Sequence, residues 1–270
     1  MIKFLYMTND PDVAEIAEKN GVDRIWVDLE MNGKEARQKG TGSVISHHTL
    51  QDVCKIRERI STSELLVRIN PWFEGSKKEI DDVIKAGADR IMLPMWKTAD
   101  EVKNFVEAVG GRVKTVLLLE TKEAAESALD EVLDLNLAEE IHVGLRDLSL
   151  SYDIDFLFSI YEKDILEMIS QKIHRKPVPF GIGGVGKFGM GFSPGPERLL
   201  IENIRLGASS IILSRTFCDS SSYEKLSDID NAFKYGIREF RKWERIAGRM
   251  SNEMLEYNRK ELIFELEGAE

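Results

Sequence analysis

Short apolar runs alternate along the chain with stretches whose apolar residues recur at helical spacing. The runs predict strands over residues 3–7, 24–29, 64–69, 90–95, 116–119, 141–143, 178–182 and 210–213. Because each strand is followed by a helix or by a connection that contains one, the pattern predicts a (β/α)8 TIM barrel, an α/β fold. A doubly wound open parallel sheet is the alternative, although such sheets ordinarily have fewer strands.

Helix-start and helix-stop residues flank the stretches between the predicted strands. Asp10-Pro11 begins a helix that Asn20-Gly21 ends, and Thr98 begins one that Gly110-Gly111 ends. Further helices are predicted over residues 49–60, 76–85, 124–133, 154–174, 194–206 and 228–249, and residues 250–270 form another amphipathic stretch. We assign residues 1–249 to the barrel domain and 250–270 to a C-terminal helical extension, which packs on its own barrel or on a neighbouring subunit.

Composition narrows the class of protein. The net charge of −10 and the absence of any basic run disfavour nucleic acid as a partner. Cys54 and Cys218 are the only cysteines and lie far apart, so neither a disulfide framework nor a thiolate metal site is expected. No apolar run reaches membrane-spanning length, and residues 1–6 are too short for a signal-peptide core. We therefore expect a cytoplasmic protein without a membrane partner.

Acidic side chains stand where several predicted strands end. Asp28 and Glu30 close the second strand, Glu120 follows the fifth, and Asp147 lies just past the sixth. The carboxyl ends of barrel strands meet at one edge, where active sites of this fold lie. Since a buried carboxylate is costly to desolvate, Glu120 and Asp147 indicate a bound divalent cation with oxygen ligands. Helix N-caps at these positions are the alternative.

Two segments at the same edge are candidate substrate loops. Residues 31–47 lack apolar periodicity and carry Lys34, Arg37 and Lys39, which predict either an anionic substrate, such as a phosphorylated or acidic sugar, or a solvated charge run. The segment GIGGVGKFGMG at 181–191 precedes a helix, at a strand where barrels often bind phosphate. It lacks the context of a dinucleotide-binding fingerprint, and a lid without a ligand of its own is the alternative.

Five motifs in chain order resemble those of the HpcH/HpaI aldolase and citrate lyase β-subunit family: WVDLE at 26–30, VRIN at 67–70, LPM at 93–95, LLET at 118–121 and GLRDLS at 144–149. The resemblance covers residues 3 to about 217. It implies a (β/α)8 barrel, a divalent metal, and cleavage or formation of a carbon–carbon bond through a pyruvate-type or acetyl-type enolate. It also implies a homo-oligomer, often with the C-terminal helix exchanged between subunits.

The resemblance also implies roles for individual residues. Glu120 and Asp147 are the expected ligands of Mg²⁺ or Mn²⁺. Arg68 is expected beside the substrate's oxo oxygen, and backbone N–H groups of residues 144–147 are expected to hold its carboxylate. The predicted substrate-binding residues are Glu30, Arg68, Gly144, Arg146 and Asp147. Without the resemblance, Arg68 is an interior arginine that only pairs with Glu120 or Glu30.

One position departs from the family pattern. Pyruvate aldolases of this family usually have a histidine directly after the glutamate of the second-strand motif, and this chain has Met31. Asp28 remains as a candidate catalytic residue, but it lacks the imidazole that it would orient. His47 and His48, in the following loop, are the candidate replacements, and His142 falls mid-strand and is expected in the core.

The predicted function is a metal-dependent carbon–carbon lyase or aldolase that acts on a 2-oxo acid. Its base would be His47, His48, or a water or hydroxide on the metal. A citrate-lyase-like or phosphoenolpyruvate-handling enzyme is the first alternative, although no basic site for a coenzyme A phosphate is evident. A lysine Schiff-base aldolase using Lys97 is a weaker one. A catalytically silent barrel that binds metal and carboxylate is the non-enzymatic alternative.

Overall fold

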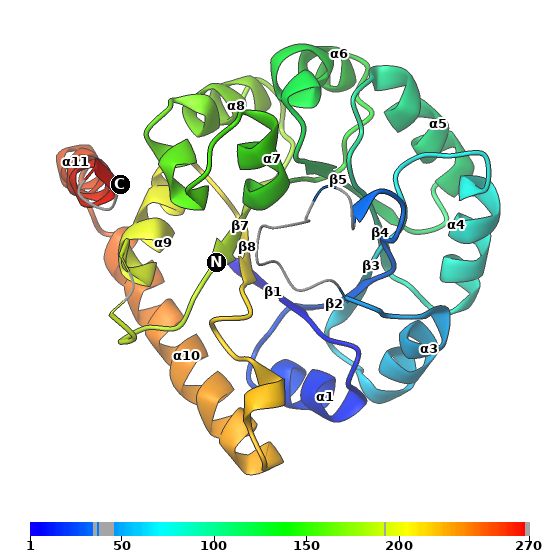
Figure 1. Ribbon diagram of the computed structural model, residues 1–270, viewed down its shortest axis with the longest axis horizontal. Helices are drawn as coiled ribbons and strands as arrows, with labels where there is room; N and C mark the ends of the chain where they lie inside the picture. The colour runs from blue at the N-terminus through cyan, green and yellow to red at the C-terminus, as the bar shows by residue number, and fades with distance from the viewer. Residues whose placement is uncertain (35–36, 38–45, 192, 268–270) are drawn as a thin grey trace.

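Eight parallel strands close into a barrel in the order β1 to β8, and helices surround it (Figure 1). The structure is a computed structural model that describes residues 1–34, 37, 46–191 and 193–267. The strands are β1 (Lys3–Met7), β2 (Arg24–Asp28), β3 (Glu64–Arg68), β4 (Arg90–Leu93), β5 (Lys114–Leu119), β6 (Ile141–Val143), β7 (Phe180–Val185) and β8 (Ser210–Leu213). The predicted TIM barrel is confirmed, and the open-sheet alternative is wrong.

The helices follow the capping signals in the sequence. Asp10 accepts hydrogen bonds from the N–H groups of residues 12 and 13, while Thr49 and Thr98 each form a capping box. The helices are α1 (Pro11–Lys19), α3 (Leu50–Arg59), α4 (Ser76–Lys85), α5 (Ala99–Val109), α6 (Leu129–Asp134), α7 (Leu145–Ser151), α8 (Ile165–Ile173), α9 (Pro196–Arg205), α10 (Leu226–Ala247) and α11 (Asn252–Glu267).

Two predicted helices differ in detail. The helix predicted over 124–133 begins as a π-helical turn, η1 (Ala124–Ala128), before α6. The stretch 154–174 is not one helix: a 3₁₀ segment, η2 (Leu157–Tyr161), is separated from α8 by Asp164, whose φ of 56° is left-handed. A left-handed residue cannot continue a right-handed helix, so the chain turns there.

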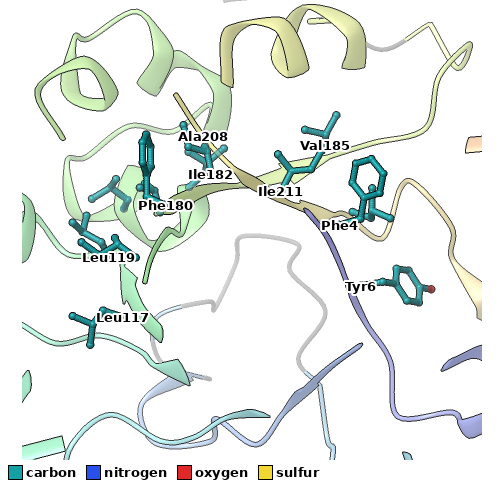
Figure 2. Close-up of a cluster of buried hydrophobic side chains, with 14 of the residues drawn as sticks. Phe4, Tyr6, Leu117, Leu119, Phe180, Ile182, Val185, Ala208 and Ile211 are labelled. Carbon is teal, nitrogen blue, oxygen red and sulfur yellow. The ribbon is translucent and has the colours of Figure 1, made fainter. Parts of the chain in front are cut away.

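Apolar residues form two layers. Alternate residues of the strands point outward beneath the helices, and Figure 2 shows part of this layer, with Leu117 and Leu119 of β5 and Phe180 and Ile182 of β7. The inward-pointing apolar residues fill the barrel itself: Leu5, Trp26, Leu66, Met92, Val116 and Leu118. The barrel is therefore a packed core, and it leaves its carboxyl end for a site.

Ion pairs close the amino-terminal end of the barrel. Arg24, which is 1% exposed, donates from Nη2 to Glu140 at 2.9 Å and from Nε to Glu64 at 2.7 Å. Arg90 donates to the same two carboxylates. Strands β2, β3, β4 and the residue before β6 are thus joined across the barrel end.

The C-terminal helix packs on its own barrel. Leu262 and Leu266 of α11 are buried, and Asn258 donates to the Arg198 carbonyl of α9 at 3.2 Å. Figure 1 shows α11 outside the ring of helices, beside α9 and α10. Among the helices of the described residues, none has the length and hydropathy that crossing a bilayer requires.

Candidate active site

Asp28 and Arg68 lie at the carboxyl ends of neighbouring strands and are register partners of β2 and β3. Arg68 donates from Nε to Oδ1 and from Nη2 to Oδ2 of Asp28, each at 2.8 Å. Both side chains point into the barrel, above Trp26, whose ring centre is 5.0 Å from the guanidinium carbon. This two-bond fork fixes the plane of the guanidinium.

Arg68 also contacts Glu30, with Nη2 3.2 Å from Oε2. Burial alone would lower the pKa of Arg68, but the charges of Asp28 and Glu30 raise it above its usual value. Burial likewise would raise the pKa of Asp28, and Arg68 and then Lys34 outweigh it and hold that pKa well below its usual range. Arg68 therefore stays a cation and Asp28 an anion at neutral pH. The alternative in which Arg68 pairs only with Glu120 or Glu30 is wrong, because Arg68 contacts Glu30 but is held most closely by Asp28.

The loop after β2 supplies two further cations to this cluster. Lys34, whose side chain is 3% exposed, donates to Asp28 and lies 3.9 Å from Glu30. Arg37 donates to Glu30, and its Nε lies 3.6 Å from Oδ1 of Asp147. The prediction of a solvated charge run is wrong for both residues, since each points inward at site carboxylates. Lys39 lies outside the described residues.

Glu120 and Asp147 form a second acidic pair nearby. Glu120 directly follows β5 and accepts a hydrogen bond from the N–H of Met95 at 3.2 Å. Both carboxylic side chains are buried. Burial, followed by the charge of Asp147, raises the pKa of Glu120 well above 4.5, against the opposing charge of Arg68. The charge of Asp147 thus disfavours the ionised form of Glu120.

Neither of these acids caps a helix. Gly144 is the N-cap of α7, and Asp147 lies in its first turn. After Glu120, the hydroxyl of Thr121 accepts from the N–H of Ala124 at 3.2 Å. The N-cap alternative is wrong for both carboxylates: Thr121, the residue after Glu120, caps the helix that follows, and Asp147 pairs with Arg37.

The acidic pair suits a divalent cation. Within the described part of the chain, no group of three or more histidine, cysteine, aspartate or glutamate side chains is placed to hold a metal. Mg²⁺, however, usually keeps several waters and takes one or two carboxylates plus substrate oxygens. Glu120 and Asp147 offer this donor set, and a cation between them would offset their mutual repulsion. Such a cation would compete with Arg37 for Asp147.

The structure separates the candidate bases. His48 accepts a hydrogen bond at Nδ1 from the N–H of Asp28 at 3.1 Å, and it borders a hollow beside α3 and α4. Burial, opposed by Asp28, lowers the pKa of His48. His47 is exposed, and Lys97 lies on the surface in an ion pair with Glu123. His142 is fully buried in β6, as expected, where burial lowers its pKa to about 3.

A cavity of about 700 Å³ opens directly above Asp28 and Arg68. Arg146 at the start of α7 and Arg215 just after β8 line it together with Lys34. Gly184 and Gly186 bring the predicted glycine-rich segment to its rim. The remaining wall combines apolar residues with hydroxyl-bearing ones: Met7, Phe156, Leu157, Phe158, Pro194, Pro196 and Leu199, together with Ser46, Ser193, Ser214 and Thr216.

Sequence reasoning missed two parts of this cavity. Arg215 follows a strand end just as Asp28 and Glu120 do, so the same rule identifies it as a site candidate. The aromatic wall at Phe156 and Phe158 had no such signal, because it lies in an irregular stretch before and within η2.

Comparisons with known proteins agree with the fold. A family model described as HpcH/HpaI aldolase/citrate lyase matches residues 3–155. No curated protein matches the chain.

Solved structures of similar fold include an HpcH/HpaI aldolase from Desulfitobacterium hafniense DCB-2, with 17% identity, a TM-score of 0.59 and coverage of 79% of this chain and 86% of that one. The citrate synthase SbnG has 15% identity, a TM-score of 0.58 and coverage of 78% and 85%. An HpcH/HpaI aldolase/citrate lyase family protein from Burkholderia cenocepacia J2315 has 14% identity, a TM-score of 0.61 and coverage of 84% and 94%. With the family model spanning more than half of its length, the chain belongs to the HpcH/HpaI aldolase/citrate lyase family.

Proposed function

We propose that this protein is a divalent-metal-dependent carbon–carbon lyase that cleaves or forms an aldol bond next to a 2-oxo acid. The observation that supports it most is the meeting of Arg68 and the acidic pair Glu120 and Asp147 at one end of the barrel. The family's aldolase and lyase activities support the reaction class. The identity of the metal, Mg²⁺ or Mn²⁺, is part of the proposal.

In this proposal Glu120 and Asp147 would hold the cation, which would supply Lewis acidity to the 2-oxo acid. Arg68 keeps a fixed positive charge where the enolate oxygen develops. Its Nε and Nη2 are held by Asp28, and within the described residues Nη1 donates to no acceptor. The two N–H groups on Nη1 of Arg68 are therefore available to a substrate oxygen. The N–H of Gly144 donates to the Leu119 carbonyl at 3.0 Å, so the backbone N–H groups of residues 145–147, with the side chain of Arg146, would hold the carboxylate.

The shape of the cavity supports a second substrate larger than a simple aldehyde. Phe156, Phe158 and Leu199 would pack against an apolar part, and Arg146 and Arg215 would pair with an acidic group. Lys34 and Arg37 face site carboxylates, so we propose that Arg146 and Arg215, rather than these two residues, bind an anionic substrate. We propose an acidic aldehyde or oxo compound with an apolar portion as this partner.

The test is exchange of deuterium from solvent into the methyl group of pyruvate, followed by NMR. Exchange that needs Mg²⁺ or Mn²⁺ and stops with EDTA would support the proposal, because it requires enolate formation without the second substrate. Glu120→Gln and Asp147→Asn should abolish both metal binding and exchange. Glu123→Gln, at an exposed carboxylate three residues from Glu120, is the matched control and should keep both. Full exchange in either site variant would refute the assignment.

Two other functions remain testable alternatives. One similar structure is that of the citrate synthase SbnG, and a citrate-lyase-like or phosphoenolpyruvate-handling reaction would use the same arginine and acids without the histidine that Met31 replaces. Turnover of citrate or phosphoenolpyruvate without pyruvate exchange would favour it. A wild type that binds metal and 2-oxo acids but turns over none of these would favour the silent barrel.

We also propose that the protein forms a homo-oligomer. Met254, Tyr257 and Phe264 on α11 are each more than half exposed, which favours burial against a second copy. Light scattering after size-exclusion chromatography tests this directly, and a monomer at micromolar concentration would contradict it.

A further inference from the structure

Lys34 occupies an unusual position for a lysine. It lies six residues after Asp28, beyond the end of β2, yet its ammonium group reaches back to Oδ2 of Asp28. The side chain is 3% exposed and lines the cavity next to Arg68. Buried lysines are rare unless paired, and this one is paired inside the substrate cavity.

Because of the charges around it, Lys34 releases its proton more readily than the neighbouring Arg68 does. Both oxygens of Asp28 already accept from Arg68, so Lys34 is a second cation on one carboxylate. Arginine holds its proton in proteins, whereas the proton affinity of lysine shifts readily on burial. Within the described residues, Lys34 interacts with Asp28, Glu30, Arg68 and His48, and the charged side chains of Arg146 and Arg215 line the same cavity. Burial and then Arg68 lower the pKa of Lys34, against Asp28 and Glu30, which raise it.

We propose that Lys34 is the proton-transferring residue of this site, held by Asp28, in place of the imidazole that Met31 does not provide. This inference rests on the proposed lyase function. In the cleavage direction, the neutral amine takes the proton of the aldol hydroxyl, the carbon–carbon bond breaks, and its electron pair forms the enolate beside Arg68. The ammonium then gives the proton to the terminal enolate carbon, which becomes the methyl group, and the amine is regenerated.

The other basic groups are less well placed. His48 is engaged at Nδ1 by the Asp28 N–H and borders a different hollow. His47 is exposed, and Lys97 pairs with Glu123 on the surface. Of the side chains weighed as bases, only Lys34 both contacts Asp28 and lines the cavity.

The first experiment compares pyruvate deuterium exchange in K34R, K34A and the surface control K97M. Lys34→Arg keeps a cation beside Asp28 but removes a releasable proton, so exchange should fall about 10²- to 10⁴-fold while Mn²⁺ affinity is unchanged. Lys34→Ala should lose exchange likewise, and added primary amines should restore part of it. Wild-type exchange should rise with pH along a limb that K34R lacks, and K97M should match the wild type.

Exchange at the wild-type rate in K34R would overturn the role of Lys34 while leaving the proposed function intact. A loss of exchange in K34A that no amine restores, with folding retained, would also count against proton transfer, because a structural lysine predicts that result.

A second measurement does not depend on turnover. In protein labelled with ¹³C-lysine, the Cε resonance of Lys34, assigned with K34R, should titrate at lower pH than that of Lys97. Titration of Lys34 together with Lys97 would overturn the inference even if the wild type is active. If the wild type shows no exchange, the proposed function fails, and early titration of Lys34 would then support proton transfer toward a different substrate.

Discussion

A Cβ atom at Gly144 would lie 2.7 Å from Oε2 of Glu120 and 3.1 Å from its Cβ. The backbone of Gly144, at φ −87° and ψ 97°, is accessible to other residues, so glycine is needed there for space. We expect Gly144→Ala to displace the Glu120 carboxylate and to weaken Mn²⁺ binding about 10- to 100-fold. Calorimetric titration with Mn²⁺ measures this, and urea denaturation shows that the fold persists.

Gly248→Ala is the control for this substitution, since a Cβ there would lie 3.4 Å from the nearest atom, a backbone oxygen, at ordinary contact distance. It should leave Mn²⁺ affinity unchanged. Wild-type affinity in Gly144→Ala would show that Glu120 does not depend on this space.

Arg37 and a divalent cation would compete for Asp147. Because Arg37 Nε lies 3.6 Å from Asp147 and its terminal nitrogen binds Glu30, Arg37→Met removes a positive charge from the proposed metal site. We expect metal affinity to rise about three- to tenfold, since a partly buried ion pair is worth roughly 1 kcal/mol. Arg238→Met, at an exposed arginine, should have no such effect. Weaker metal binding in Arg37→Met would mean that Arg37 supports the acidic pair instead of competing for it.

Arg68→Lys tests the fork to Asp28. Lysine keeps the charge but cannot donate two parallel hydrogen bonds to one carboxylate, so the cation beside the enolate oxygen loses its fixed position. Pyruvate exchange should fall about 10²- to 10³-fold with little change in metal affinity. Exchange at the wild-type rate would place Arg68 outside the reaction centre.

Much of this site could be predicted from where strands end. Asp28, Arg68 and Glu120 each close or follow a short apolar run, and parallel strands in a barrel bring such positions to one edge. Asp28 and Arg68 form their ion pair because β2 and β3 are consecutive in the chain and adjacent in the barrel.

The loop residues were not predictable in the same way. Residues 31–47 carry no periodicity, so nothing in the sequence distinguishes an inward Lys34 from a solvated one. Its direction follows from the buried carboxylates of Asp28 and Glu30, whose need for counter-charge is a property of the folded site. The same holds for His48, whose ring nitrogen is fixed by the backbone of Asp28.

The ion pairs at the amino-terminal end predict a stability effect. Arg24→Met would leave Glu140, which is 6% exposed, without its closest cation. Breaking a buried pair on one side typically costs about 3–5 kcal/mol of unfolding free energy, and because Arg90 still donates to Glu140 we expect a loss at or below the lower end of that range. Urea denaturation at pH 7 measures the loss. Arg59→Met, at an exposed arginine paired with Asp12, should change stability by no more than about 0.5 kcal/mol.

The stability difference between the wild type and Arg24→Met should depend on pH. Burial would raise the pKa of Glu64, but hydrogen bonds from Arg90 and Arg24 outweigh it and lower that pKa from 4.5 to about 2. The stabilisation from Glu64 is therefore present above pH 4.5 and is lost as pH falls toward 2. The stability gap between wild type and Arg24→Met should narrow at pH 3. A gap that stays constant from pH 7 to 3 would show that Glu64 gains nothing from Arg24.

Helix α9 has two different neighbours. One side contributes Pro196 and Leu199 to the cavity above Asp28 and Arg68, and the other pairs Arg198 and Arg205 with glutamates of α11. The C-terminal helix α11 thus packs behind α9, which forms one wall of the cavity, although none of the residues of α11 lines that cavity. Evolution or engineering could therefore retune substrate choice from the outside of the barrel, through α11, with every reacting group left in place.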